Sequence, residues 1–333
     1  MNILATLKEN HFPEIIDDNA KAKLESMGNV IYRADLNKDT GEKEYSTALQ
    51  ESKADIVMTC WDSPLLTFKV YKENPQLKYL CNMAGEVRPY VDLEVIKAGL
   101  IVSNWGNVIA KSVAEGALMM ILSALRRTTY FQVEMHVRKG WAGMKQPEGL
   151  FYQKVGLLGL GAIACELVKL LQPFECIIYA YDPHVADQVF EKLNVNRLSA
   201  IEELVKTCRI ISIHAAKTPE TFHVIDTNML STMEDGGVIV NTARGAIIDT
   251  TALIAELKTG RIEAALDVFE EEPLRENSEL RGLDNCMLMP HLAGPTSDRR
   301  SDMGNFAIAN IENFIKGCKI LSIVTPEKYE LIT

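Results

Sequence analysis

The 333-residue chain lacks any apolar run of the roughly 20 residues that a membrane-spanning helix requires. Its amino terminus also lacks the long apolar stretch and the small-residue cleavage site of a secretory signal. The seven cysteines are scattered and form no CxxC pair, which is typical of free thiols in a reducing cytosol and not of disulfides or a zinc site. These absences predict a cytoplasmic protein that has neither a membrane partner nor a metal site.

The chain also has fewer basic than acidic residues. Lys and Arg number 35 against 45 Asp and Glu, which gives a formal net charge of −10. Because nucleic acids and anionic membranes bind basic surfaces, we expect neither as a partner. Hydrophobic residues make up 47% and charged residues 24%, the balance of a globular protein. A chain of this length exceeds one ordinary core, so two domains are expected.

Short β-branched segments alternate with helical segments through most of the chain, a pattern that predicts an α/β protein built on parallel sheets. Residues 210–213 are apolar on both faces, as central parallel strands must be. The expected strands form a first series at 2–6, 55–59, 79–83 and 100–103, and a second at 154–158, 176–181, 209–214, 238–241, 263–268 and 286–289.

Two helical segments connect the two series of strands. Residues 108–127 and 302–316 carry apolar side chains at helical spacing, and a small strand-like run near Val324 follows the second. We therefore expect the tail to return to the first domain, which makes that domain discontinuous. The predicted domains are residues 1–104 with 296–333, and residues 105–295.

The strongest local signal is a GxGxxA sequence at residues 159–164, which follows an expected strand and opens a helix. Gly159 permits the tight turn, Gly161 lets a pyrophosphate approach the backbone, and Ala164 allows close packing of the helix on the strand. The N–H groups at the start of the helix, at Ala162 and Ile163, would face the phosphates. The ordinary alternative is a turn that serves packing only.

Asp182 ends the next expected strand, 182 − 159 = 23 positions after the first glycine. An acidic residue at about this distance accepts hydrogen bonds from the adenosine ribose. Its charge repels a 2′-phosphate, and neither Arg nor Lys follows at residues 183–185. The sequence therefore predicts NAD as the cofactor and not NADP.

Three further segments lie at the carboxyl ends of expected strands, where open parallel sheets bind ligands. They read Asn241-Thr242-Ala243-Arg244-Gly245, Asp267-Val268-Phe269-Glu270-Glu271-Glu272-Pro273 and Met289-Pro290-His291-Leu292-Ala293-Gly294. Taken singly, each has an ordinary alternative: a surface arginine, a plain acidic loop and a core histidine. Three such coincidences at successive strand ends are much less common than one.

Together these segments resemble the D-isomer-specific 2-hydroxyacid dehydrogenase family, which includes phosphoglycerate, glyoxylate, hydroxypyruvate and D-lactate dehydrogenases. The motifs ARG, DVFxxEP and PHxAG occur here in order, and the resemblance covers residues 149–294 strongly and the remainder more loosely. It implies two doubly wound parallel-sheet domains, a Rossmann NAD-binding domain at 105–295 and a flavodoxin-like substrate-binding domain from the rest. We also expect a homodimer.

The resemblance implies that Arg244, Glu272 and His291 form the catalytic trio, and their chemistry agrees. Arg244 is a planar, permanently charged fork that suits a carboxylate. His291 can give a proton to a carbonyl oxygen, and a neighbouring Glu272 would favour the imidazolium. The hydride belongs to the nicotinamide. The expected reaction is hydride transfer between NAD(H) and a small D-2-hydroxy acid or 2-keto acid.

The resemblance also places other residues around the cofactor. Asp267 matches the family position that holds the nicotinamide carboxamide, although a turn cap is its ordinary alternative. His214 begins a segment like the family's HxPLTxET, but Ala216 stands where the family usually has proline. The expected cofactor-binding residues are Gly159, Gly161, Ala162, Ile163, Asp182, His214, Thr242, Ala243, Arg244, Asp267, His291 and Gly294.

The first domain departs from the family pattern. Residues 82–92 read NMAGEVRPYVD where the family commonly has GxGxDxxD. Gly85 is placed to offer N–H groups to a carboxylate, and Arg88 either adds charge there or pairs with Glu86. Trp61 and Trp105 have no assigned role, and the sequence does not name the substrate. The expected substrate-binding residues are Gly85, Glu86, Arg244 and His291.

Two other functions compete with the dehydrogenase. One is an NAD(H)-sensing binding protein of the same fold, like the family's corepressor-like branch, with little turnover. The other is formate oxidation, but the family's formate enzymes pair the histidine with glutamine, and this sequence has Glu272.

Overall fold

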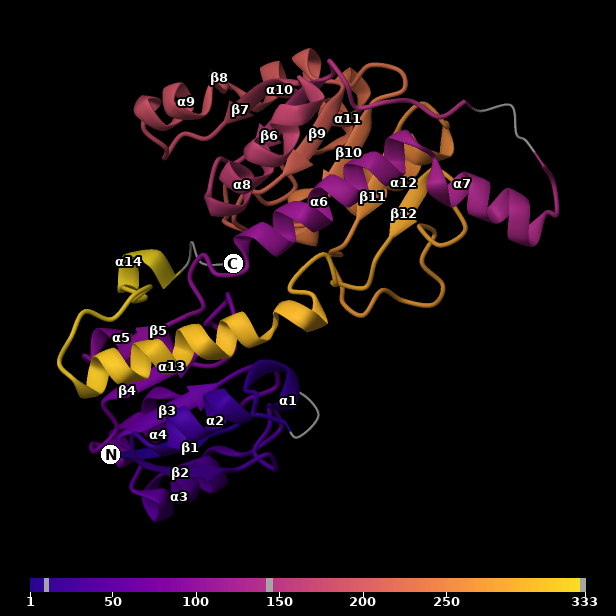
Figure 1. Ribbon diagram of the computed structural model, residues 1–333. Helices are drawn as coiled ribbons and strands as arrows, with labels where there is room; N and C mark the ends of the chain where they lie inside the picture. Colours follow the sequence, from indigo (N-terminus) through magenta and orange to yellow (C-terminus); the bar gives the residue numbers. More distant parts are fainter. Residues whose placement is uncertain (9–11, 142–145, 330–333) are drawn as a thin grey trace. The chain divides into compact units, whose positions relative to one another are not determined.

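The structure is a computed structural model that describes residues 1–8, 12–141 and 146–329. It divides into two compact units, unit 1 from Met1–Ile109 with Thr296–Thr333 and unit 2 from Ala110–Pro295 (Figure 1). The first division between the units falls where α6 (Ala110–Leu125) begins. The carboxyl-terminal segment belongs to unit 1, so this unit is discontinuous in sequence.

Unit 1 is built on one five-stranded sheet whose neighbouring strands are all parallel. The strand order, β2-β1-β3-β4-β5, is the flavodoxin-like order with its switch point between β1 and β3. The strands are β1 (Asn2–Ala5), β2 (Asn29–Tyr32), β3 (Ile56–Thr59), β4 (Tyr79–Asn82) and β5 (Ile101–Ser103).

Helices cover both faces of this sheet. On one face α13 packs against α1, α2 and β4, so segments from the two ends of the chain lie side by side, yellow-orange against indigo and purple in Figure 1. On the other face α3, α4, α5 and α14 form a second group. The helices are α1 (Phe12–Ile15), α2 (Asp18–Glu25), α3 (Glu42–Ser52), α4 (Phe68–Glu73), α5 (Leu93–Lys97), η4 (Ser297–Arg299), α13 (Ser301–Ile315) and α14 (Pro326–Tyr329).

Unit 2 is built on a seven-stranded sheet, also parallel throughout. Its order, β12-β11-β10-β9-β6-β7-β8, reverses between β6 and β9, which is the Rossmann arrangement. Ligands of such sheets bind at the carboxyl ends beside this reversal. The strands are β6 (Lys154–Leu158), β7 (Ile177–Tyr181), β8 (Asn196–Arg197), β9 (Ile210–Ile213), β10 (Val238–Asn241), β11 (Glu263–Leu266) and β12 (Cys286–Leu288).

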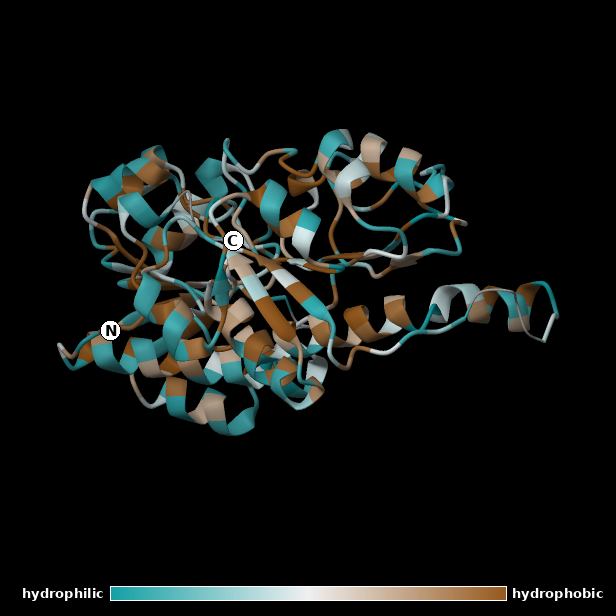
Figure 2. Cartoon of the chain, turned by 90° about the horizontal axis from the view of Figure 1, so that it is seen from above, coloured by the Kyte–Doolittle hydropathy of each residue, from teal (hydrophilic) through white to brown (hydrophobic). Residues whose placement is uncertain are grey.

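The sheet of unit 2 is buried between two apolar layers. One contains α6, α8 and α9, and the other α10, α11 and α12. Helices in Figure 2 carry hydrophobic (brown) and hydrophilic (teal) residues in alternation, and in unit 2 the buried apolar residues of the helices pack against the sheet. The helices of this unit are α6 (Ala110–Leu125), α7 (Thr128–Gln132), η1 (Val133–Val137), α8 (Ala162–Leu171), η2 (Gln172–Phe174), α9 (Asp187–Leu193), α10 (Ile201–Thr207), α11 (Thr227–Thr232), η3 (Gly245–Ile247) and α12 (Thr250–Lys258).

The expected α/β architecture is confirmed, with local differences. The edge strands β2 and β8 were not expected, because they are short and carry no fully buried residue that would give them a strand-like pattern. The expected helix over 108–127 begins two residues later and ends at Leu125, since Arg127 adopts a left-handed backbone (φ 52°). Within the described residues, no helix combines the length and apolarity needed to cross a membrane.

Candidate active site

The glycine-rich turn follows β6 at the reversal of the unit 2 sheet. Gly159 has φ +94°, and a Cβ there would lie 2.9 Å from the backbone nitrogen of Ala215 and the carbonyl oxygen of His214. Only glycine combines this conformation with so close an approach to the neighbouring loop. Gly161 is the N-cap residue of α8, and a Cβ on it would meet no atom within 4 Å.

Asp182 joins the end of β7 to this turn. Its Oδ2 accepts a hydrogen bond from the Leu160 N–H at 2.8 Å, and its Oδ1 accepts one from the His184 N–H at 2.9 Å. Each carboxylate oxygen has a second lone pair, so further donors can bind there. The expected acid therefore lies at the turn, and it also holds the turn in place.

His214 lies at the end of β9. Its Nε2 is 2.9 Å from the Oγ of the buried Ser212, and burial lowers the pKa of His214 to about 4. The ring is neutral at pH 7, so His214 is not suited to donate a proton to a substrate at that pH.

The loop after β10 carries Arg244. The buried side chain of Asn241 shapes it: Oδ1 accepts from the Ala243 N–H at 3.0 Å, and Nδ2 donates to the Arg244 carbonyl at 2.9 Å. The Arg244 guanidinium donates to the Ala243 carbonyl at 2.7 Å. These bonds fix the backbone that presents the guanidinium.

Glu272 and His291 form a direct pair. His291 Nδ1 lies 2.8 Å from Glu272 Oε2, and Glu272 Oε1 accepts the Phe269 N–H at 3.0 Å. The hydrogen bond to Glu272 raises the pKa of His291 above its ordinary value, although partial burial opposes the rise. Partial burial acts to raise the pKa of Glu272, but the hydrogen bonds from His291 and Phe269, with Arg244 nearby, lower it. Imidazolium and carboxylate are therefore favoured together.

The pair leaves one nitrogen of the histidine for chemistry. With Nδ1 bound to the carboxylate, Nε2 is the ring atom that can exchange a proton with a bound molecule. Gly245, the residue after Arg244, packs against the backbone of Phe269 and Glu270, so the Arg244 loop lies beside the loop that carries Glu272 and its partner His291. His291 also has a positive φ of 58°, a conformation that non-glycine residues adopt rarely and often at functional sites.

Asp267 holds the histidine loop. Its Oδ1 accepts the Leu292 N–H at 2.7 Å and its Oδ2 the Ala293 N–H at 3.0 Å, while its carbonyl accepts the His291 N–H at 2.9 Å. The side chain is only 3% exposed. Asp267 therefore acts as a cap of this turn, and its contact with a nicotinamide stays a prediction. Gly294, at the end of the same loop, packs closely on Val113 of α6.

In unit 1, two asparagines organise the loop that follows β4. Nδ2 of the buried Asn82 donates to the carbonyls of Ala84 (3.2 Å) and Glu86 (2.9 Å), and Nδ2 of Asn104 donates to the carbonyl of Gly85 (2.7 Å). Because a trans peptide points its C=O and the following N–H in opposite directions, the N–H groups that follow these carbonyls point away from the asparagines. Such a run of N–H groups suits an anion.

The remaining predicted features of unit 1 lie close to this loop in sequence or at the end of β3. Arg88 Nε is 2.7 Å from Glu86 Oε1, so the pairing considered from the sequence is present. Trp61 and Trp105 meet edge to face, with ring centroids 6.3 Å apart at 81°. The guanidinium of Arg300, on the returning tail, lies 5.3 Å from the centroid of Trp61.

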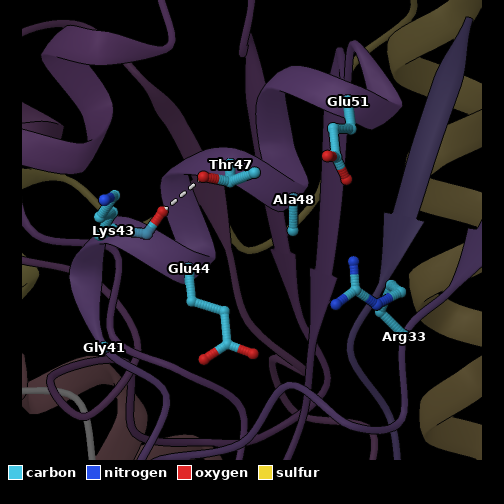
Figure 3. Close-up of a pocket in the computed structure, with 7 residues that line it drawn as sticks. All are labelled: Arg33, Gly41, Lys43, Glu44, Thr47, Ala48 and Glu51. Carbon is cyan, nitrogen blue, oxygen red and sulfur yellow. Dashed lines mark hydrogen bonds between the residues drawn. The ribbon is translucent and has the colours of Figure 1, made fainter.

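A shallow cavity on unit 1 is lined by residues of a different region (Figure 3). Arg33 and Glu51 face each other across it, and the Arg33 guanidinium is already held by the Asp35 carboxylate at 2.6–3.1 Å. None of the predicted site residues lines this cavity. We therefore assign it no role in the site.

Comparison with known proteins matches the site to a family. The model of the D-isomer specific 2-hydroxyacid dehydrogenase NAD-binding domain matches residues 118–293, which include the glycine-rich turn and all three residues of the trio. The chain belongs to the D-isomer specific 2-hydroxyacid dehydrogenase family. Its relatives named glyoxylate reductase and D-3-phosphoglycerate dehydrogenase support NAD-dependent dehydrogenase activity on a CH–OH donor, and the resemblance seen in the sequence is confirmed.

Relatives within the family differ in length. The chain is 32% identical to a D-3-phosphoglycerate dehydrogenase of Methanocaldococcus jannaschii over 84% of its own residues, but it spans only 54% of that protein. It is also 32% identical to a glyoxylate reductase of Thermococcus litoralis, covering 86% of the chain and 88% of the relative. The solved structure of D-2-hydroxyisocaproate dehydrogenase has the same fold, with a TM-score of 0.83, 23% identity and coverage of 98% and 100%.

NAD is the cofactor of the family, and unit 2 has the features to hold it. Among the residues that the structure describes, no side chain caps the amino terminus of α8, so the N–H groups of Ala162 and Ile163 are placed to bind phosphate beside the open space at Gly161. The hydroxyl of Thr242, a predicted contact, is buried and has no partner among the described residues. A bound group or an ordered water can supply the missing partner of such a buried hydroxyl.

Sequence reasoning missed several residues of this family member's site. Asn241 was seen only as part of a motif, because its hydrogen bonds to the Arg244 loop depend on how its side chain is oriented. Arg197, on β8, donates to the Asp182 carbonyl at 3.2 Å although it lies fifteen positions further along the chain. Glu270 and His223 form a second Glu–His pair, for which the sequence offered only an acidic run and an isolated histidine.

Proposed function

We propose that this chain reduces a small 2-keto acid to the D-2-hydroxy acid with NADH, and catalyses the reverse oxidation with NAD. The observation that carries the proposal is the Glu272–His291 pair, whose bond of 2.8 Å favours an imidazolium beside the positive charge of Arg244. A proton donor and a carboxylate clamp next to a dinucleotide-binding turn are the protein groups that this reduction needs. Family membership supports the same reaction.

Each residue of the trio has a separate task in the proposed reaction. The bound cofactor supplies hydride transfer to the keto carbon. Arg244 binds the substrate carboxylate and polarises the carbonyl. His291 Nε2 gives its proton to the carbonyl oxygen, so one keto acid, one hydride and one proton yield the hydroxy acid. Glu272 orients the ring and stabilises its charge until the proton has moved.

Unit 1 supplies the second part of the proposed substrate recognition. We assign it as the substrate-binding domain and unit 2 as the NAD-binding domain. The N–H groups after Ala84, Gly85 and Glu86 would bind the substrate carboxylate, because Asn82 and Asn104 hold the carbonyls of this loop on the opposite side. Gly85 and Glu86 therefore remain the proposed substrate residues here.

We also propose a cytoplasmic homodimer. Support for the cytoplasm comes from the cysteines, all seven of which are free thiols. Support for a dimer comes from the segment of α7, η1 and the residues that follow, where Met135, Val137 and Trp141 are exposed, the last by 84%. Apolar side chains exposed together on one segment are typical of a subunit contact. Light scattering during gel filtration measures this directly, and a monomeric mass would contradict the dimer.

A panel of 2-keto acids tests the proposed activity. Oxidation of NADH is followed with acids that range from glyoxylate and hydroxypyruvate to branched, aromatic and phosphorylated ones, and the product is analysed on a chiral column. We expect turnover with at least one member and a D product wherever C2 is a stereocentre. Binding of NADH without turnover of any member would instead favour the NAD(H)-sensing alternative.

A further inference from the structure

The loop that carries Glu272 holds a second carboxylate in a second Glu–His pair. Glu270 Oε2 lies 2.8 Å from His223 Nε2, and Glu270 Oε1 accepts the N–H of Thr250, the first residue of α12, at 2.9 Å. Both side chains of the pair are 31% exposed. The proposed chemistry uses neither Glu270 nor His223, so the pair requires an explanation of its own.

His223 is fixed to the segment that follows Arg244. Its N–H donates to the Ala246 carbonyl at 2.9 Å, and its ring stacks on that of Phe222, with centroids 3.9 Å apart. Its φ is 51°, a left-handed conformation that non-glycine residues adopt rarely. The ring that meets Glu270 is therefore held by the backbone as well as by its neighbour.

The same two loops also touch through their backbones. A Cβ on Gly245 would lie 1.9 Å from the carbonyl carbon of Phe269 and 2.3 Å from the nitrogen of Glu270. The residue after Arg244 is thus pressed against the segment that precedes Glu272. Phe269 in turn donates its N–H to Glu272 at 3.0 Å, so a shift of this contact would reach the Glu272 carboxylate through one bond.

From these contacts we propose that Glu270 is a positioning residue. Through His223 and Thr250 it holds the Arg244 loop against the Glu272 loop, and so sets the separation between the guanidinium and the Glu272–His291 pair. The inference rests on the proposed function, because that separation matters when one substrate must meet both groups.

The charge state of Glu270 fits this task. Partial burial acts to raise its pKa, but the hydrogen bonds from Thr250 and His223 lower it, so Glu270 is a carboxylate at neutral pH. Its two oxygens accept from two different segments, one before Arg244 in sequence and one after it. Removing the carboxylate leaves the Thr250 N–H and the His223 ring without this partner, while Glu272 keeps its own bonds.

Steady-state kinetics of Glu270→Ala, Glu270→Gln and His223→Gln test the proposal, with Glu271→Ala as the matched control. Glu271 neighbours Glu270 but pairs with Arg275 at 2.6 Å on the exposed side of the loop. We expect Glu270→Ala to raise the KM of the 2-keto acid about tenfold and to lower kcat several-fold, because a misplaced clamp misaligns the carbonyl. Glu270→Gln keeps an acceptor for Thr250 and should recover most of the loss.

If Glu270 is a positioning residue, its replacement should change the kinetics with the keto acid and leave the affinity for NADH nearly unchanged. The Kd for NADH should change less than twofold in each variant, and Glu271→Ala should match the unmodified protein in all constants. Kinetic constants for Glu270→Ala within twofold of those for Glu271→Ala would overturn the proposal. So would an equal loss of NADH and keto-acid binding together with a lowered Tm, since that result describes general destabilisation.

Hydrogen exchange of the backbone amides gives a readout that needs no turnover. Peptides covering residues 244–250 should exchange faster in Glu270→Ala than in Glu271→Ala, because the Thr250 N–H and its loop lose their anchor. If the unmodified protein reduces no 2-keto acid, the proposed function fails, and the exchange result still decides what Glu270 does. Equal exchange in the two variants would overturn the positioning role.

Discussion

The surroundings of two histidines in unit 2 shift their pKa values in opposite directions. His214 lies against the buried Ser212, and desolvation there lowers its pKa to about 4. His291 is half exposed and bonded to the Glu272 carboxylate, which raises its pKa. The same residue type is therefore suited to a neutral structural role at one strand end and to proton transfer at another.

Replacing Glu272 by Gln should shift the pH dependence of the reaction. The variant keeps a hydrogen-bonding group but loses the anion that raises the pKa of His291, so that pKa falls. Reduction needs the protonated ring, and its rate declines as pH rises through the pKa of His291. The decline in kcat/KM for the keto acid should therefore begin at lower pH in Glu272→Gln than in the unmodified protein. Superimposable profiles would disprove the coupling of Glu272 to His291.

Replacing Asp182 by Ser should admit NADPH. The Asp182 carboxylate would repel a 2′-phosphate. Arg197 donates to the Asp182 carbonyl and pairs with Asp187, so its guanidinium lies close enough to bind a 2′-phosphate once the carboxylate is removed. We expect kcat/KM for NADPH, relative to NADH, to rise about tenfold or more. Arg197→Ala in the Asp182→Ser background should remove most of that gain. Comparable kcat/KM for the two cofactors in the unmodified protein would refute the role of Asp182.

At the scale of elements, the carboxyl ends of the strands in the unit 2 sheet carry the site, while the amino end of the sheet carries an ion pair that stabilises the unit. The carboxyl ends of β6, β10, β11 and β12 lead into the turns that carry the site residues. At the amino end, Glu263 begins β11 with its side chain 7% exposed, and it pairs with Arg127 just after α6. Arg127 also donates to the Gln146 carbonyl at 3.1 Å. This ion pair ties the first helix of unit 2 to the sheet.

Removing Glu263 should destabilise the fold. Breaking a buried ion pair from one side costs about 3–5 kcal/mol, and the lower end applies because Arg127 keeps its bond to Gln146 and has the Glu148 carboxylate at 4.0 Å. We expect Glu263→Ala to lower the free energy of unfolding in urea by about 3 kcal/mol. Glu279→Ala serves as control, since its pair with Lys258 is exposed and such pairs contribute less than about 1 kcal/mol. Equal midpoints for the two variants would contradict this account of the pair.

Prediction from sequence succeeded for elements with a strong pattern. The strand β9 is buried throughout and has isoleucine at three of its four positions, and its neighbours in the unit 2 sheet were also expected, as was the helix α13. The strand β8 was missed because two exposed residues, Asn196 and Arg197, give no pattern. The missed strand matters for the site, because β8 carries Arg197, which donates a hydrogen bond to the Asp182 carbonyl. Bonds between residues far apart in sequence, such as those of Asn82 and Asn104, leave no periodic signal either.

At the scale of the whole molecule, the alternation of strand-like and helical segments predicted parallel sheets, and the family resemblance implied two of them. The expected strands placed Arg244, Glu272 and His291 after three successive strands. Because parallel strands bring their carboxyl ends to one edge of the sheet, the three residues were expected at the same edge. The sequence could not show that Glu272 bonds Nδ1, which leaves Nε2 for the substrate, or that Glu270 ties two loops together. Those details depend on side-chain rotamers and on backbone conformations such as that of His291.

The central claim is that unit 2 binds NADH and that Arg244, Glu272 and His291 are needed for reduction of the keto acid but not for binding of the cofactor. The most direct measurement compares single-turnover oxidation of bound NADH by a 2-keto acid in the unmodified protein and in His291→Ala, with the Kd for NADH measured on both. We predict a rate lowered about 10²–10⁴-fold in His291→Ala and a Kd within about threefold. A rate within twofold of the unmodified protein, with NADH bound equally well, would contradict the account.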